Sequence, residues 1–462
     1  MTLYRDIEED AMLAALIRAF LRVYGLLLPG GTRHSRIVEG DAGAMRLGDK
    51  LWWAHKFFVH PVEHAQRHTD IETRLTAPLR FAPPRDFIAV DSITVTSAGD
   101  LLTSEHIRPE TAAHLWDEVA EWAFSADLAL ANLETPVSPS RAQAAPPRSI
   151  LKAPPLNSSR EMLRVFTGSG SRFTFFSTAN NHCLDQGIGG LRETLDVLDA
   201  ECVGFVGTSR SPVEQDDVPI VERGGIRIAI LSYSFSVNGR EFPTGTEYSV
   251  NLVRLNAQDP DLSLIRRHLE IARRQKNADV VLACLHWSLE FESFPVQPLI
   301  DTAHRIAALG VDALLGNHPH TVQPLEQVRV RDPFSGFEKD VLIAYAHGDT
   351  VSWLPNVPNS TLGLMLRTTI VRGIEKGRTV TRITAVEHRF ITRRFTFDGE
   401  RCVDVRVVGL DDEIARETTL PSRSEARLAE LHRLQELGRR LIPAGEPAAR
   451  ATIGLDGPQP DR

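Results

Sequence analysis

The chain has 462 residues, of which 42% are hydrophobic and 24% charged, the composition of a globular protein with an ample core. Its formal charge of -8 at pH 7 argues against nucleic-acid binding, which requires a basic surface. Its four cysteines show no C-x-x-C pairing, which favours a reduced, cytoplasmic protein over a disulfide-bonded one.

Residues 1–88 are predicted to form a helical N-terminal extension. Residues 11–28 have the pattern of an amphipathic helix, and residues 51–58 are rich in aromatic side chains. The helix is expected to be neither a signal peptide nor a transmembrane segment, because acidic residues precede it and Arg18 and Arg22 interrupt it. Packing against the body of the protein is the favoured arrangement, and contact with a membrane surface or a partner is the alternative.

The following segment, residues 89–410, has the alternating pattern of an α/β domain. Short apolar runs predict buried strands, and amphipathic segments between them predict helices. The apolar runs are residues 93–97, 127–131, 173–177, 280–284, 311–315 and 341–345, and the helical patterns are residues 110–124, 190–200, 261–275 and 296–309. Strand-like residues 378–410 are expected to complete a second sheet.

Loops and the C-terminus complete the predicted organisation. Residues 136–155 are rich in Pro, Ser and Ala and are expected to form a surface loop, and residues 235–248 are placed as a lid after a strand. Residues 411–442 are assigned to a C-terminal helix, and residues 443–462 to a disordered tail.

Each apolar run ends in polar residues that can bind a metal or move a proton. Because α/β sheets place such groups beyond the carboxyl ends of their strands, we expect them to meet at one edge. They are Asp100, Glu134, Asn180, Asn181, His182, His286, His318, His320 and His347. Each residue alone could have a purely structural role, as a turn residue or a hydrogen-bonded core histidine. Their occurrence at the ends of successive strands predicts a metal site.

The chemistry of these residues limits the choice of metal ion. Mixed oxygen and nitrogen ligands suit one or two divalent ions of Mn, Zn, Fe or Co better than calcium. Asn181 offers an amide oxygen, and His182 remains available for proton transfer with Asp185 orienting its ring. Pro319 is expected to hold His318 in an extended backbone, so that His318 and His320 point in different directions.

The order of these motifs resembles the CapA family, also called poly-γ-glutamate capsule biosynthesis proteins, which has the calcineurin-like metallophosphatase fold. The resemblance covers roughly residues 93–350 and implies a four-layer α/β sandwich. It rests on Gly99-Asp100, Asn132-Leu133-Glu134, Ala179-Asn180-Asn181-His182 with Asp185 and Gly187, His286-Trp287 with Glu290, and Gly316 with His318-Pro319-His320 and Gln323.

The resemblance also implies roles for individual residues. The metal ligands would be Asp100, Glu134, Asn181, His286, His318 and His320. His182, steered by Asp185, would be the acid/base residue, and the expected substrate contacts are Asn180, Trp287, Glu290 and His347. The chain departs from the family pattern in three places: Asn317 replaces a His, no His follows two residues after Asp100, and His347-Gly348-Asp349 replaces a Leu-Gly-Asn-Phe-like run.

These features predict a metal-dependent enzyme that acts on a peptide or polyamide. Within the resemblance, the lasso peptide epimerases suggest Cα epimerisation of a peptide's C-terminal residue as the first hypothesis. A metal would stabilise the charge that follows Cα deprotonation, although a second proton donor is not assigned. The rivals are amide processing related to poly-γ-glutamate, a metallophosphoesterase, and a non-catalytic capsule-assembly protein.

Overall fold

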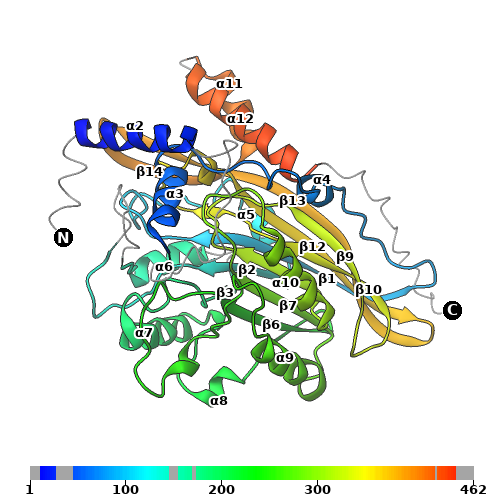
Figure 1. Cartoon of the computed structure of the whole chain (residues 1–462). Coiled ribbons are helices and arrows are strands. Elements are labelled where there is room, and N and C mark those ends of the chain that lie inside the picture. Colours follow the sequence, from blue (N-terminus) through cyan, green and yellow to red (C-terminus); the bar gives the residue numbers. More distant parts are fainter. Residues whose placement is uncertain (1–10, 28–44, 145–154, 169–172, 422–423, 444–462) are drawn as a thin grey trace, which may run out of the picture.

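The computed structural model describes residues 11–27, 45–144, 155–168, 173–421 and 424–443, and the chain folds around two β-sheets (Figure 1). The first sheet has the strand order β14-β13-β12-β1-β2-β3-β4, with β11 paired to the end of β1. Its strands are β1 (Ile88–Leu101), β2 (Leu128–Leu133), β3 (Phe175–Ser177), β4 (Gly204–Val206), β11 (Asp349–Val351), β12 (Gly363–Glu375), β13 (Arg378–Asp398) and β14 (Arg401–Gly409).

The second sheet has the order β5-β6-β7-β8-β10-β9. Its strands are β5 (Ile220–Arg223), β6 (Ile226–Ser234), β7 (Val280–His286), β8 (Ala313–Asn317), β9 (Leu325–Arg331) and β10 (Glu338–Ala344). The centre of each sheet is parallel: β1 to β4 in the first, and β6, β7, β8 and β10 in the second. Each of the six apolar runs overlaps one of these parallel strands, so the strand prediction is confirmed.

The two sheets face one another across an apolar core and carry helices on their outer faces. Strand β1 contacts β6 and β8, and side chains such as Val95 and Ile230 share one core cluster. Helices α5 (Ala120–Phe124), α6 (Arg160–Thr167) and α7 (Gly187–Ala200) cover the first sheet, and α9 (Ser263–Glu270), the π-helical turn η2 (Ile271–Gln275) and α10 (Gln297–Ala308) cover the second. The expected four-layer α/β arrangement is confirmed.

Further helices lie at the ends of the chain. The extension holds α2 (Ala11–Leu27), α3 (Leu47–Phe58) and α4 (Ile71–Leu75), and the C-terminal part holds α11 (Leu410–Thr419) and α12 (Glu425–Leu441). Short turns of helix are α8 (Pro212–Gln215), η1 (Glu247–Ser249) and η3 (Pro358–Thr361). The blue N-terminal and orange-to-red C-terminal helices lie on the same side of the molecule (Figure 1), where Arg433 of α12 pairs with Glu63 at 3.0 Å.

Three sequence predictions about elements were wrong in part. Residues 378–410 extend the first sheet, because β12 pairs antiparallel with β1 and brings β13 and β14 with it. Helix α5 begins only at Ala120, because the carbonyls of Thr111 and Leu115 accept hydrogen bonds from β14. The C-terminal segment forms two helices, and α11 ends at Thr419 before Pro421, which cannot continue a helix.

The N-terminal helix α2 is amphipathic, as expected, and only part of it is buried. Leu21 is buried, whereas Leu16, Phe20 and Val23 are exposed. Within the described ranges, no helix has both the length and the apolar character needed to cross a bilayer. The predicted tail beyond Pro443 and part of the predicted loop at 136–155 lie outside the described residues.

His268 of α9 is a buried histidine that links the second sheet to its helical cover. Its Nδ1 lies 2.9 Å from the hydroxyl of Tyr233, and its Nε2 lies 3.4 Å from Asp216. Burial lowers the pKa of His268 from 6.5 to about 4. The unfolded chain therefore gains a proton near pH 6.5 that the folded chain gains only near pH 4, so stability falls as pH drops through this window.

We expect acidification from pH 7 to pH 5 to destabilise the wild-type protein by about 2 kcal/mol more than a His268→Gln variant, because glutamine does not titrate. Urea unfolding of both proteins at the two pH values measures the difference. A His114→Gln variant is the control, because His114 is an exposed histidine. Equal pH dependence of wild type and His268→Gln would contradict the prediction.

Candidate metal centre

The residues that follow the parallel strands converge at one edge of the two sheets and are buried there. Two groups of possible ligands lie there. Within each group, the donor atoms all lie within 4.8 Å of one another. One group is Glu134, His286 and His318, and the other is Asp100, His320 and Asp349. The strand ends that the sequence singled out are therefore brought together.

The first group offers donor atoms that no protein group satisfies. Both carboxylate oxygens of Glu134 and both ring nitrogens of His318 are buried without a hydrogen-bond partner among the described residues. Nε2 of His286 lies 3.4 Å from Glu134 and 2.9 Å from the amide oxygen of Asn181. Burying such groups unpaired is costly, so their arrangement fits a divalent cation held by Glu134, His286, His318 and Asn181.

The second group depends on a close approach between β1 and β11. A side chain at Gly99 would lie 1.8 Å from the carbonyl oxygen of Gly348, so only glycine permits this contact. The approach places Asp100 and Asp349 opposite one another in the parallel pairing. Nδ1 of His320 lies 2.8 Å from Asp349, and two carboxylates with an imidazole suit a second cation.

The electrostatics of the two groups suit the binding of a cation. Burial, followed by the charge of Glu134, raises the pKa of Asp100, and burial raises the pKa of Glu134 to about 7. Burial lowers the pKa of His286 and His318 well below the usual value, so both imidazoles stay neutral. The neutral imidazoles of His286 and His318 are in the form that binds a metal. Burial alone would lower the pKa of His320, but the charges of Asp349 and Glu134 outweigh it and raise that pKa, so this imidazole would have to lose its proton on binding a metal.

One sequence expectation about this site was wrong. Pro319 does not hold His318 in an extended backbone, because His318 has a φ of +104°. Its N–H donates to Asp100 at 3.1 Å, which ties the residue to the end of β1. The rings of His318 and His320 still diverge, with their centroids 6.1 Å apart, and each joins a different ligand group.

A histidine–aspartate pair lies in the turn between β3 and α7. Nδ1 of His182 is 2.6 Å from Asp185, and Asp185 also accepts the N–H of Leu156 at 2.7 Å. Burial alone would lower the pKa of His182, but the charge and hydrogen bond of Asp185 outweigh it and raise that pKa. Because Nδ1 is bonded to Asp185, Nε2 of His182 is the nitrogen available for proton transfer. The partly exposed Arg240 lies 3.5 Å from Asp185.

Comparison with protein families places residues 94–353, more than half of the chain, in the family described as bacterial capsule synthesis protein PGA_cap. The chain belongs to this family. Its N-terminal extension, including α2 and α3, lies outside the matched region.

Individual relatives of this PGA_cap chain are distant. It is 23% identical over 241 residues to the PGA biosynthesis protein CapA of Bacillus subtilis (strain 168), covering 51% of this chain and 60% of the relative. It is 22% identical over 243 residues to the capsule biosynthesis protein CapA of Bacillus anthracis, covering 51% and 56%. The chain thus spans less than two thirds of the curated relatives it matches. The crystal structure of the calcineurin-like phosphoesterase YfkN from Bacillus subtilis aligns with 77% of this chain and 99% of its own, at 11% identity and a TM-score of 0.33.

Three of the four expected substrate contacts of this PGA_cap chain are engaged by the protein itself. Asn180 donates to the carbonyl of Leu133 at 2.8 Å and accepts the N–H of His182 at 3.1 Å. Trp287 is fully buried and donates to the carbonyl of Tyr345 at 3.0 Å. His347 lies between Ser97 and Gly316, with both ring nitrogens bonded. These contacts favour structural roles for the three residues. Glu290, the fourth expected substrate contact, is partly exposed and lies 4.0 Å from His320.

Two polar residues of the site were missing from the sequence-based set. Asp349 belongs to the second ligand group, and Asn132 donates to Asp100 at 2.7 Å, with its amide nitrogen also 3.3 Å from His286. The signal for Asp349 was its place four residues after the apolar run that ends at Tyr345. The signal for Asn132 was its position beside Glu134 at the end of β2.

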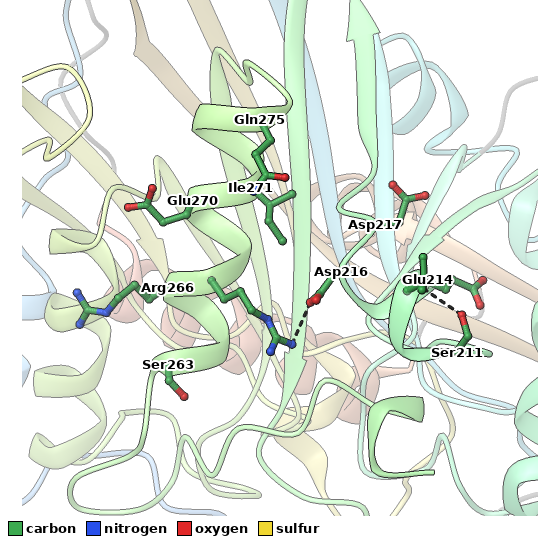
Figure 2. A pocket seen from close by; sticks show the side chains of 11 residues that line it. Ser211, Glu214, Asp216, Asp217, Ser263, Arg266, Glu270, Ile271 and Gln275 are labelled. Atoms are coloured by element: carbon green, nitrogen blue, oxygen red, sulfur yellow. Dashed lines mark hydrogen bonds and ion pairs between the residues drawn. The ribbon is translucent and has the colours of Figure 1, made fainter. Parts of the chain in front are cut away.

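A broad surface groove of about 1060 Å³ lies away from this centre and is formed mainly by α8, α9 and η2 (Figure 2). None of the predicted site residues lines it. Figure 2 shows Arg266 and Glu270 on one side pointing away from Asp216 and Asp217 on the other. Across the groove Arg267 pairs with Asp216 at 2.9 Å, and among the described residues its lining forms no group of candidate metal ligands.

Proposed function

We propose that this PGA_cap protein is a metal-dependent enzyme that hydrolyses amide bonds in a polyamide or peptide substrate. The observation that carries the proposal is the pairing of unsatisfied metal donors, on Glu134 and His318, with the nearby His182–Asp185 acid/base pair. Such residues would hold a divalent ion, which would supply Lewis acidity toward a carbonyl oxygen and toward a water nucleophile.

The protein's own residues supply the proton that amide cleavage needs. An amine leaves only when its nitrogen is protonated, and His182, whose pKa Asp185 raises, can donate that proton from Nε2. Asp185 fixes the ring through Nδ1, and the hydrogen bond from Leu156 fixes Asp185 in turn. His182 thus acts as the general acid on the leaving nitrogen.

The relatives' names support a polyamide substrate. They are described as PGA and capsule biosynthesis proteins, and poly-γ-glutamate is a polyamide with a free carboxylate on every residue. Arg240, partly exposed beside Asp185, offers a guanidinium that can pair with such a carboxylate close to the acid/base histidine.

Cα epimerisation, the first hypothesis from the sequence, is less well supported than hydrolysis. Epimerisation removes a proton from one face of Cα and delivers another to the opposite face, whereas His182 serves one face. The second histidine–aspartate pair, His320 with Asp349, belongs to a ligand group. Hydrolysis needs only one such donor, because the nucleophile is water.

We expect the protein, loaded with Mn²⁺ in D₂O, to cleave poly-γ-glutamate oligomers and to release new amino termini without deuterium at Cα. Its turnover should fall in the ordinary enzyme range, on the order of 1–10³ per second. Mass spectrometry and amine labelling measure both quantities, with EDTA-treated protein as the control.

The same experiment identifies the rival reactions. An uncleaved peptide with one deuterium at a single Cα would replace hydrolysis by epimerisation. Turnover of simple phosphate esters without amide cleavage would indicate a phosphoesterase. Binding of the oligomer with no chemical change would indicate a capsule-assembly role.

A further inference from the structure

Helix α3 of the N-terminal extension contacts the loop that follows β7, at the border of the metal centre. Nε1 of Trp53 donates to a carboxylate oxygen of Glu290 at 2.5 Å. Nζ of Lys56 donates to the carbonyl of Glu290 at 2.7 Å and pairs with the carboxylate of Glu292 at 2.9 Å. Lys56 and Glu292 are both buried, so this is an internal connection between segments more than 200 residues apart.

Aromatic packing continues this connection to a candidate ligand. The rings of Trp53 and Phe57 lie 5.8 and 5.5 Å from Phe291. Phe291 in turn stacks on His320, with 5.9 Å between their centroids. The extension therefore reaches His320 by two routes, one through Glu290 and one through Phe291.

The contacted loop has a backbone that needs support. Ser288 and Phe291 both have positive φ angles, at +75° and +63°. Residues other than glycine rarely adopt this backbone region. Asn256 bonds to both backbone groups of Ser288, and Val62 donates to the carbonyl of Phe291 at 2.8 Å. Lys56 adds contacts at Glu290, between these two supports, and at Glu292, directly after them.

Glu290 stands between the extension and the second ligand group. One of its oxygens accepts the indole N–H of Trp53, and the other lies 4.0 Å from Nε2 of His320. Because Nδ1 of His320 is bonded to Asp349, Nε2 is the nitrogen that faces Glu290. Rotation of the Glu290 side chain would take its charge away from His320, and the bond to Trp53 opposes that rotation.

We infer that Trp53 and Lys56 are positioning residues of the metal centre, which hold Glu290 against His320 and thereby strengthen cation binding at the Asp100–His320–Asp349 group. The inference rests on the metal centre of the proposed function but not on the reaction. By this inference, helix α3 contributes to the metal centre of this chain, although it lies outside the family-matched residues 94–353.

The test is Mn²⁺ binding to the full-length protein, measured by titration calorimetry without substrate. We expect Trp53→Phe, which keeps the ring and removes the N–H, to weaken one of two binding steps by roughly 10-fold, the scale for loss of an outer hydrogen-bond partner. Trp52→Phe is the matched control on the same helix, because among the described residues the indole N–H of Trp52 has no partner. Its binding should equal that of wild type.

A double-mutant cycle separates positioning from general support of the fold. If Trp53 acts through Glu290, then Glu290→Gln should weaken the same step, and adding Trp53→Phe to it should change little. Equal binding by Trp53→Phe and Trp52→Phe, or full additivity with Glu290→Gln, would overturn the inference.

The outcomes for the inference and for the proposed function are separable. Wild-type protein that binds Mn²⁺ but cleaves no amide would remove the proposed function and leave the inference in place. Cleavage of amides by the wild-type protein, together with unchanged metal binding in Trp53→Phe, would support the proposed function and overturn the inference. Wild-type protein that binds no divalent metal would overturn both.

Discussion

Replacing His318 by alanine is expected to remove most of the metal bound at the Glu134–His286–His318 group. The buried ring nitrogens of His318 have no hydrogen-bond partner among the described residues, so the substitution would take a donor from the cation. The affinity should fall by at least the roughly 10–100-fold that loss of an outer partner costs. Elemental analysis after desalting measures the retained metal, with Mn, Zn, Fe and Co determined together.

Thermal unfolding provides an independent readout of the same change. A ligand at about 100 times its Kd stabilises a folded protein by about 2.7 kcal/mol. Added metal should therefore raise the melting temperature of wild-type protein and raise that of His318→Ala much less. His304→Ala is the control, because His304 pairs with Glu326 at 2.9 Å and belongs to neither ligand group. Full metal retention in an Asp100/His286/His318 triple alanine variant would refute the site.

Replacing His182 by alanine is expected to lower activity by about 10²–10⁴-fold and to leave the bound metal in place. His182 is bonded to Asp185 and lies in neither ligand group, and for this reason we assign it proton transfer in the proposed function. An Asp185→Asn variant should lower the pKa of His182, because the carboxylate that raises it is removed. Since His182 acts in its protonated form, the loss of activity at high pH should then begin at a lower pH.

The chain contains a matched control for this pair. His114 and Asp117 have the same i, i+3 spacing and a similar distance, 2.9 Å, but lie exposed. His114→Ala should leave both activity and metal content unchanged. If His182→Ala loses metal together with activity, His182 is a ligand and the assignment of proton transfer is wrong.

Much of the centre could be predicted because its residues follow strands. Asp100, Glu134, His286 and His318 each end an apolar run, and parallel strands bring such ends to one edge. Asp349 was harder to identify, because its position depends on the pairing of β11 with β1, a contact across some 250 residues that local pattern does not encode.

Other departures from the predicted arrangement have the same origin in tertiary contacts. Trp287 follows His286, yet successive residues at a strand end face opposite ways, and the ring of Trp287 packs beside Tyr345. Residues 110–124 have a helical pattern, but β14 takes two of the carbonyls that a helix would use. The contact of α3 with Glu290 could not be foreseen either, since nothing in residues 47–58 specifies a partner far along the chain.

The spacing of the second ligand group has a consequence for when an ion could bind to it during synthesis. Asp100, His320 and Asp349 are spread over some 250 residues, and β11 is the element that completes the group. At about 5–20 residues per second, a ribosome needs roughly 12–50 s to pass from the first of these ligands to the last. No emerging fragment that stops short of Asp349 carries the whole group, so an ion that needs all three residues could bind only after Asp349 has been synthesised.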